Sequence, residues 1–214
     1  LKGQAFESSQ RHGKFLFVRL SEEPWLVLHF GMTGFLRYSK KGELPEHSRV
    51  VFDFESGYQL AYVCQRLLGE VDLAEDPGGY VESREMGPDA LQMGRNDFKE
   101  KMQGRRGGIK SALMNQKILA GIGNVYSDEI LFHAGIHPGR PVKELSDRVL
   151  SRLYSHMRRI LEETIGFRAN PDEAPDDYLL RRREEGQPCP NCPGEIARAR
   201  ISGRSSYFCP SCQN

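Results

Sequence analysis

The chain has 214 residues, of which 38% are hydrophobic and 28% charged, and a mean hydropathy of −0.56. This composition excludes a protein built from membrane-spanning helices, and the length allows two domains and a small additional module. The net charge of +1 conceals an asymmetry: residues 1–98 carry 11 Lys/Arg against 15 Asp/Glu, whereas residues 99–214 carry 19 against 14. The basic half is the one expected to meet a polyanion, although solvated helix faces produce the same bias.

The first third of the chain has the pattern of short antiparallel strands. Aromatic and β-branched segments between turn-forming residues predict strands over residues 14–20, 25–30, 49–54 and 59–63. Glu55–Tyr58 predicts a hairpin turn between the last two. Because no helical pattern lies between these strands, we expect an antiparallel β-sandwich domain over residues 1–86.

After Gly87 the apolar residues recur at the three-and-four spacing of amphipathic helices. This spacing predicts helices over residues 111–120, 124–134 and 146–165. Ser146 is expected to cap the last helix, and Gly135 to stop the one before it. A helical domain is therefore predicted over residues 87–186.

A glycine-rich turn, Ala120-Gly-Ile-Gly-Asn124, directly precedes the second of these helices. Glycines permit close backbone approach, and exposed amides at a helix N-terminus attract phosphate. Asn124, next to Gly123, is expected at the helix start, either as its cap or as a donor to the same phosphate. A plain helix–turn–helix corner, whose glycines only allow tight packing, explains this turn equally well.

The C-terminal tail carries two C-x-x-C pairs separated by sixteen residues: Cys189, Cys192, Cys209 and Cys212. Four thiolates at this spacing predict one tetrahedral, structural Zn²⁺ site with no open position for chemistry, and a disulfide pair is the alternative. The residues between the pairs predict two strands that turn at Ser202–Arg204, so the metal would present Arg204 near the tip of a hairpin. The remaining cysteine, Cys64, is a single thiol and indicates a reducing, intracellular compartment.

Taken together, the turn and the cysteine tail resemble the formamidopyrimidine-DNA glycosylase/endonuclease VIII family. Residues 109–116 followed by AGIGNVYSDEILFHAGIHP are similar to its helix-two-turn-helix segment, and GRSSYFCPSCQ to its zinc finger. RHGKFLF and LHFGMTGFLR are similar to its N-terminal sandwich, in the same order. The resemblance implies an α+β protein with a β-sandwich domain (1–86), a helix-two-turn-helix DNA-binding domain (87–186) and a four-cysteine zinc finger (187–214).

Members of this family excise oxidised bases from DNA and then cleave the backbone at the abasic site by β,δ-elimination. The DNA lies in a cleft between the sandwich and the helical domain, with the damaged nucleotide flipped out of the stack. The resemblance thus implies a monomeric DNA glycosylase and AP lyase with one structural Zn²⁺. Its partner would be double-stranded DNA with an oxidised base or an abasic site, and no membrane is involved.

Four residues match family positions that hold the DNA backbone, and a fifth is expected to contact DNA. Asn124 and the amide of Gly123 match the phosphate contact beside the lesion, and Arg204 matches the zinc-finger arginine that grips the flanking phosphates. Lys110 is also expected to contact DNA. Lys14, in RHGKFLF, matches a lysine near the lesion phosphate, and together with Arg204 it is expected to support catalysis. Without the family context, a solvated strand-edge lysine is the simpler interpretation of Lys14.

Two residues of LHFGMTG match positions near the flipped nucleotide. By similarity, His29 contacts the DNA backbone, and Met32 enters the stack to fill the space that the flipped base leaves. From the sequence alone, a core position for Met32 is the alternative.

The segment 62–69 departs from the pattern of members that are specialised for 8-oxoguanine. Those members carry two arginines and a phenylalanine that probe the orphaned cytosine and fill the stack. Arg66 aligns with the first arginine, Leu67 with the second and Leu68 with the phenylalanine. Because leucine donates no hydrogen bond from its side chain, we expect weak opposite-base selection and a broader or pyrimidine-type lesion range.

The start of the chain departs from the family pattern as well. The family reaction begins with an N-terminal proline, whose amine attacks the sugar C1′ and forms a Schiff base, and a glutamate acts as acid and base. This chain opens with Leu1. We therefore expect a nucleophile upstream of Leu1 and a sandwich that is incomplete at its N-terminus. A non-catalytic lesion- or DNA-binding protein, or a protein-interaction ribbon on another fold, are the alternatives.

Overall fold

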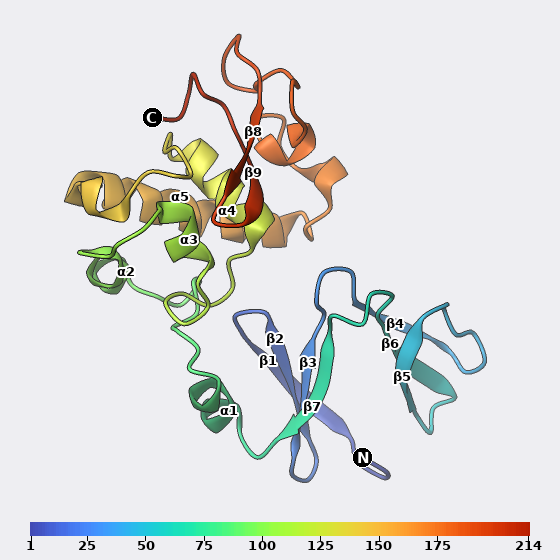
Figure 1. Cartoon of the computed structure of the whole chain (residues 1–214). Helices are drawn as coiled ribbons and strands as arrows, with labels where there is room; N and C mark the ends of the chain where they lie inside the picture. The colour runs from blue at the N-terminus through green and yellow to red at the C-terminus, as the bar shows by residue number, and fades with distance from the viewer. The chain divides into compact units, whose positions relative to one another are not determined.

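A computed structural model describes all 214 residues and divides them into two compact units (Figure 1). Unit 1 is Leu1–Glu85 and unit 2 is Met86–Asn214. Neither unit contains a helix with the length and apolar character that crossing a membrane requires. The finer predicted boundary, between residues 186 and 187, stays a prediction.

Unit 1 consists of two antiparallel sheets and one short helix. The first sheet has the order β1-β2-β3-β7, with β1 (Phe6–His12), β2 (Phe15–Leu20), β3 (Trp25–His29) and β7 (Glu70–Ala74). The second has the order β4-β6-β5, with β4 (Phe35–Lys40), β5 (Ser48–Asp53) and β6 (Tyr58–Val63). The helix α1 (Pro77–Ser83) follows β7 and has Asp76 as its N-cap.

The core of unit 1 lies between these two sheets. Leu20 and Leu28 of the first sheet belong to one apolar cluster with Tyr62, Leu36 and Val50 of the second. This face-to-face packing confirms the predicted antiparallel sandwich. The pattern missed β1, β4 and β7, which all lie at sheet edges and carry mostly exposed or partly exposed side chains. An edge strand of this kind lacks the apolar alternation that reveals a strand.

Unit 2 is helical. Its α-helices are α2 (Arg95–Met102), α3 (Ile109–Met114), α4 (Asn124–His133) and α5 (Asp147–Gly166), and its 3₁₀ turns are η1 (Val142–Glu144), η2 (Pro171–Glu173) and η3 (Leu179–Arg182). The longest helix, α5, buries Leu150, Leu153 and Met157 in the unit's main core. It starts as predicted, because the hydroxyl of Ser146 accepts a hydrogen bond from the backbone amide of Val149 at 3.4 Å.

One predicted helix is too long. The expected helix over residues 111–120 ends at Met114, and the chain then runs through turns to α4. The cause is Asn115, whose side-chain oxygen accepts a hydrogen bond from the amide of Lys117 at 3.0 Å. Such a local bond offers the backbone an alternative to the helical ladder.

The C-terminal hairpin pairs β8 (Ala197–Ile201) with β9 (Arg204–Phe208). Ser202 and Gly203 form the two-residue turn, with φ values of 50° and 79°. Two successive left-handed residues match the right-handed twist of the flanking strands, which makes this the favoured short hairpin turn. The predicted turn is confirmed, and Arg204 is the first residue after it.

Candidate nucleic-acid interface and zinc centre

The four cysteines of the tail lie together in unit 2. The Sγ atoms of Cys189 and Cys212 are 3.8 Å apart, those of Cys192 and Cys209 are 3.5 Å apart, and all four lie within 4.8 Å of one another. A tetrahedral Zn²⁺ with bonds of about 2.3 Å holds its sulfurs about 3.8 Å apart. The cysteines form no disulfide. Their arrangement therefore fits a structural Zn²⁺, which would tie the two ends of the hairpin together.

Backbone amides support the first pair of cysteines. The amide of Asn191 points to Sγ of Cys189, and that of Gly194 to Sγ of Cys192, each at 3.4 Å. Amides that donate to sulfur stabilise the thiolate form, which is the form that binds metal. The first C-x-x-C turn is thus shaped as a ligand pair.

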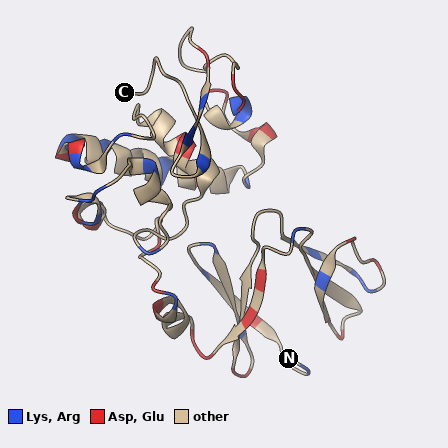
Figure 2. Ribbon diagram, in the orientation of Figure 1, with Lys and Arg blue, Asp and Glu red and all other residues tan.

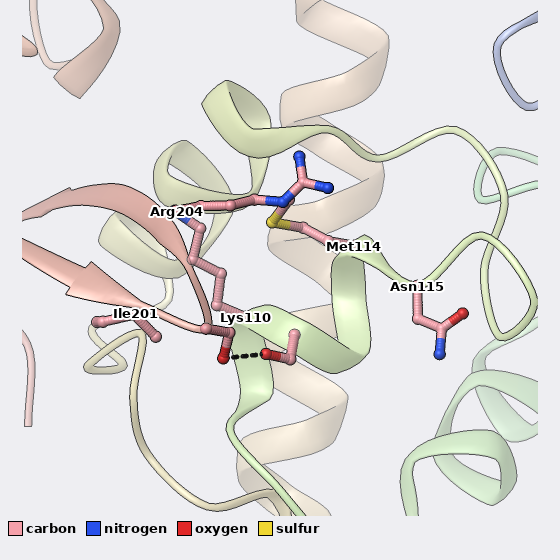
Figure 3. A pocket seen from close by; sticks show the side chains of 7 residues that line it. Lys110, Met114, Asn115, Ile201 and Arg204 are labelled. Carbon is pink, nitrogen blue, oxygen red and sulfur yellow. Dashed lines mark hydrogen bonds between the residues drawn. The ribbon is translucent and has the colours of Figure 1, made fainter.

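Arg204 projects from the hairpin beside α3. It lines a shallow pocket of about 210 Å³ together with Met114 and Asn115 of the α3 segment and Ser202 of the turn (Figure 3). The hydroxyls of Ser111 and Ser202 share a hydrogen bond across this pocket. Residues 99–214 carry 19 Lys/Arg against 14 Asp/Glu, an excess that suits a polyanion, and Figure 2 shows Lys and Arg on the hairpin and on helices of unit 2 together with some Asp and Glu.

Asn124 is connected to the residue that follows Arg204 in β9. The N-cap of α4 is Gly123, Asn124 is the first residue of the helix, and no side chain makes a capping bond, so the alternative of Asn124 as the cap is wrong. Its side-chain amide donates instead to the carbonyl of Ser205 at 3.1 Å. Because Ser205 adjoins Arg204, the structure brings Asn124 and Arg204 together from segments about eighty residues apart.

Lys110 is not at the surface. Only 1% of the residue is exposed, and its ammonium donates to a carboxylate oxygen of Asp128 and to the hydroxyl of Ser206, both at 2.6 Å. Burial lowers the pKa of the Lys110 ammonium, and the Asp128 carboxylate opposes that fall. The predicted contact of Lys110 with DNA stays a prediction, and this geometry favours a positioning role instead. Asp128 and Ser206 were missed, and the one sequence signal is an acidic pair, Asp128-Glu129, inside an apolar helix.

In unit 1, two neighbouring loops carry exposed apolar side chains. Met32 is 71% exposed in the loop after β3, and Leu67 and Leu68 are 66% and 52% exposed in the loop before β7. The alternative of a core position for Met32 is therefore wrong. Arg66 is also exposed, beside Leu67. The structure presents these side chains to solvent, as an insertion into stacked bases requires.

The two loops pack backbone against backbone. A Cβ atom on Gly31, at φ +62°, would lie 2.6 Å from the carbonyl carbon and oxygen of Leu68. The hydroxyl of Tyr62 donates to the carbonyl of His29 at 2.7 Å, next to Gly69. Burial raises the pKa of Tyr62 to about 12, so this hydroxyl stays a donor over the physiological range. We name the pair of loops, residues 30–34 and 64–69, the ledge.

His29 and Lys14 lie near the ledge. Nδ1 of His29 accepts a hydrogen bond from the amide of Gly31 at 3.3 Å, and its ring centroid lies 4.8 Å from that of Phe15. Burial lowers the pKa of His29, against the effect of Glu70. Lys14 is exposed in the turn between β1 and β2. The DNA-contact roles of both residues stay predictions.

Gly31→Ala is expected to lower the free energy of unfolding of unit 1 by about 2–3 kcal/mol, since the new methyl group meets the Leu68 carbonyl at a left-handed φ. The single tryptophan, Trp25, lies in β3 and reports urea unfolding of this unit by its fluorescence. Gly57→Ala is the matched control, because Gly57 has φ +80° and open space around it. Gly57→Ala should lower the free energy of unfolding by about 1 kcal/mol. Equal decreases for the two variants would contradict the close contact between Gly31 and the Leu68 carbonyl.

Three family models match successive parts of the chain. The formamidopyrimidine-DNA glycosylase N-terminal domain matches residues 1–71, the formamidopyrimidine-DNA glycosylase H2TH domain matches 86–171, and the zinc finger found in FPG and IleRS matches 186–214. The formamidopyrimidine-DNA glycosylase of Pelotomaculum thermopropionicum is 35% identical over an alignment of 218 positions, which covers 95% of this chain and 79% of that protein. The enzyme of Gluconobacter oxydans is 35% identical over an alignment of 235 positions, which covers 100% of this chain and 84% of that protein. The chain belongs to the formamidopyrimidine-DNA glycosylase family.

Solved structures of family members agree with this assignment. A complex of the Lactococcus lactis enzyme with DNA that contains FAPY-dG superimposes with a TM-score of 0.90 at 26% identity, covering 99% of this chain and 83% of that one. A complex of the same enzyme with abasic-site DNA gives a TM-score of 0.88 at the same identity and coverage. Membership in the formamidopyrimidine-DNA glycosylase family supports base-excision repair of damaged DNA bases as the protein's role.

Proposed function

We propose that this protein excises oxidised bases from double-stranded DNA and then cleaves the abasic site by β,δ-elimination through a Schiff base. The observation that carries the proposal is the junction of α4 with β9, where Asn124 bonds to the residue beside Arg204. An amide donor and a permanently charged guanidinium at one place suit two adjacent phosphates. The relatives crystallised with lesion-containing and abasic-site DNA support the same kind of partner.

The ledge supplies the second part of the proposal. A base must leave the stack before its glycosidic bond can be attacked, and the loss of stacking costs a few kcal/mol. Met32, Leu67 and Leu68 are exposed and apolar, so their insertion offsets part of that cost. Lys14 and His29 are proposed to contact the backbone near the lesion. The attacking amine is assigned to no residue of this chain.

Borohydride trapping on a duplex with one abasic site tests the proposed chemistry. The protein with its natural N-terminus should yield a covalent adduct, because borohydride reduces a Schiff base to a stable amine. Specific binding of this duplex without any adduct would overturn the lyase proposal and leave a non-catalytic DNA-binding protein.

The opposite base is expected to have little influence on binding. Leu67 offers no hydrogen-bond donor, so affinities for an abasic-site analogue opposite each of the four bases should agree within about threefold. Leu67→Arg should create a preference of about tenfold for cytosine, since one good arginine–base pair is worth about 1–3 kcal/mol. Fluorescence anisotropy on the four duplexes measures both, with Leu67→Met as the control. A strong preference in the unmodified protein would show that another group reads this base.

A further inference from the structure

The buried carboxylate of Asp128 joins three separate elements of unit 2. On one oxygen it accepts a hydrogen bond from the Lys110 ammonium of α3 at 2.6 Å. On the other it accepts bonds from the guanidinium of Arg183, just after η3, at 2.7 Å and from the amide of Tyr207 in β9 at 3.2 Å. Asp128 is itself on α4 and only 1% exposed. One side chain therefore links α4 to α3, to the segment after η3 and to the zinc hairpin.

This link continues directly to the two proposed phosphate contacts. Lys110 also donates to the hydroxyl of Ser206 at 2.6 Å and lies 3.4 Å from the carbonyl of Ser205. The same Ser205 carbonyl accepts the side-chain amide of Asn124 at 3.1 Å. Ser205, which adjoins Arg204 and binds the Asn124 side chain, is thus connected through Lys110 to the Asp128 carboxylate.

The charges in this chain of bonds depend on one another. Lys110 and Asp128 are both almost fully buried, and an ionised group without its partner there is strongly unfavourable. The hairpin is consequently most stable in the position against α3 and α4 in which the Tyr207 amide reaches Asp128 and the Ser206 hydroxyl reaches Lys110. A phosphate-binding pair held at a set spacing before DNA arrives avoids the entropy cost of ordering it during binding.

We infer that Asp128 is a positioning residue that sets the spacing between Asn124 and Arg204 and thereby the affinity for lesion-containing DNA. The inference rests on the proposed function, because it takes those two residues as the phosphate contacts. Asp128 touches no DNA in this role and acts through Lys110, Tyr207 and Ser205. It adds a residue to the site that neither the cysteine pattern nor the glycine turn indicates.

Glu129, the next residue of α4, provides a matched control. It is also only 1% exposed, and its carboxylate accepts bonds from the amides of Leu179 at 2.9 Å and Leu180 at 2.7 Å. These bonds hold η3, and no hydrogen bond connects Glu129 to β9. Loss of its charge should therefore lower the stability of unit 2 without moving Arg204.

A double-mutant cycle on binding tests the inference. Asp128→Asn should weaken binding to a duplex with an abasic-site analogue about tenfold and lower the salt slope by about one, as Arg204→Ala does. In the Arg204→Ala background, Asp128→Asn should weaken DNA binding no more than about twofold, because the arginine that Asp128 positions is gone. Equal losses in both backgrounds would reduce Asp128 to a structural residue and overturn the inference. Glu129→Gln should leave the salt slope unchanged, and a reduced slope in this variant would also overturn the inference.

Two further measurements keep the outcome unambiguous. Zinc content shows whether each variant keeps its hairpin. If Asp128→Asn loses zinc, Ser206→Ala replaces it in the double-mutant cycle. This variant should weaken DNA binding about threefold, since it removes only one hydrogen bond of Lys110. Equal losses with and without Arg204 would again overturn the inference. If the unmodified protein binds the abasic and the intact duplex equally, the proposed function fails. If it prefers the abasic duplex but the effects of the two mutations are additive, only the positioning role of Asp128 is rejected.

Discussion

Cys192→Ser is expected to release the zinc and to weaken DNA binding by about a hundredfold while unit 1 stays folded. Serine is a poor zinc ligand, and the binding free energy of a structural zinc is also folding free energy of its module. The metal would also tie together the small apolar cluster of the tail, because the cysteines form much of that cluster with Phe132, Leu179 and Ile196. When the strands separate, Arg204 and the Ser205 carbonyl that Asn124 binds are both displaced.

Metal analysis and binding measurements on the same sample check this prediction. The variant should contain far less than one zinc per chain, and the fluorescence of Trp25 should report unchanged urea unfolding of unit 1. Cys64→Ser is the control, since it removes a thiol of unit 1 outside the zinc cluster and should keep the metal. Full zinc retention in Cys192→Ser would mean that the ligands are assigned wrongly.

Arg204→Ala is expected to weaken binding about tenfold across all duplex sequences and to reduce the slope of log affinity against log salt by about 0.9. One arginine–phosphate contact releases about one counterion, and a phosphate contact carries no sequence information. Zinc content and thermal stability should not change, because Arg204 is exposed at the start of β9.

Arg200→Ala is the control for this variant. Arg200 is also exposed on the hairpin, but it pairs with Ser205 and points to the other face of the two strands from Arg204, which pairs with Ile201. Its loss changes the charge of the hairpin equally and should affect binding much less. Arg204→Lys should restore part of the affinity, since lysine keeps the charge but lacks the bidentate fork. Equal salt slopes for Arg204→Ala and the unmodified protein would remove Arg204 from the interface.

Local chemistry explains which features could be predicted from the sequence. The C-x-x-C pairs carry their own turn geometry, and Ser202-Gly203 adopts the left-handed conformations that its short hairpin needs. The helix over residues 147–166 was predicted because its apolar spacing and its serine cap are both properties of neighbouring residues. In the same way, Met32 and Leu67 were singled out from two short motifs, residues 28–34 and 62–69, each of which is local to its own segment.

The sequence by itself therefore determined the strands with alternating side chains, two of the three predicted helices, the cysteine cluster and the residues near the hairpin turn. Only the tertiary structure decided that Lys110 is buried against Asp128 and Ser206, that Asn124 bonds to Ser205, and that Gly31 packs on the Leu68 carbonyl. The physical reason is distance along the chain. Lys110 and Ser206 are 96 positions apart, and no local pattern records which donor will meet which acceptor once two distant segments share a buried space.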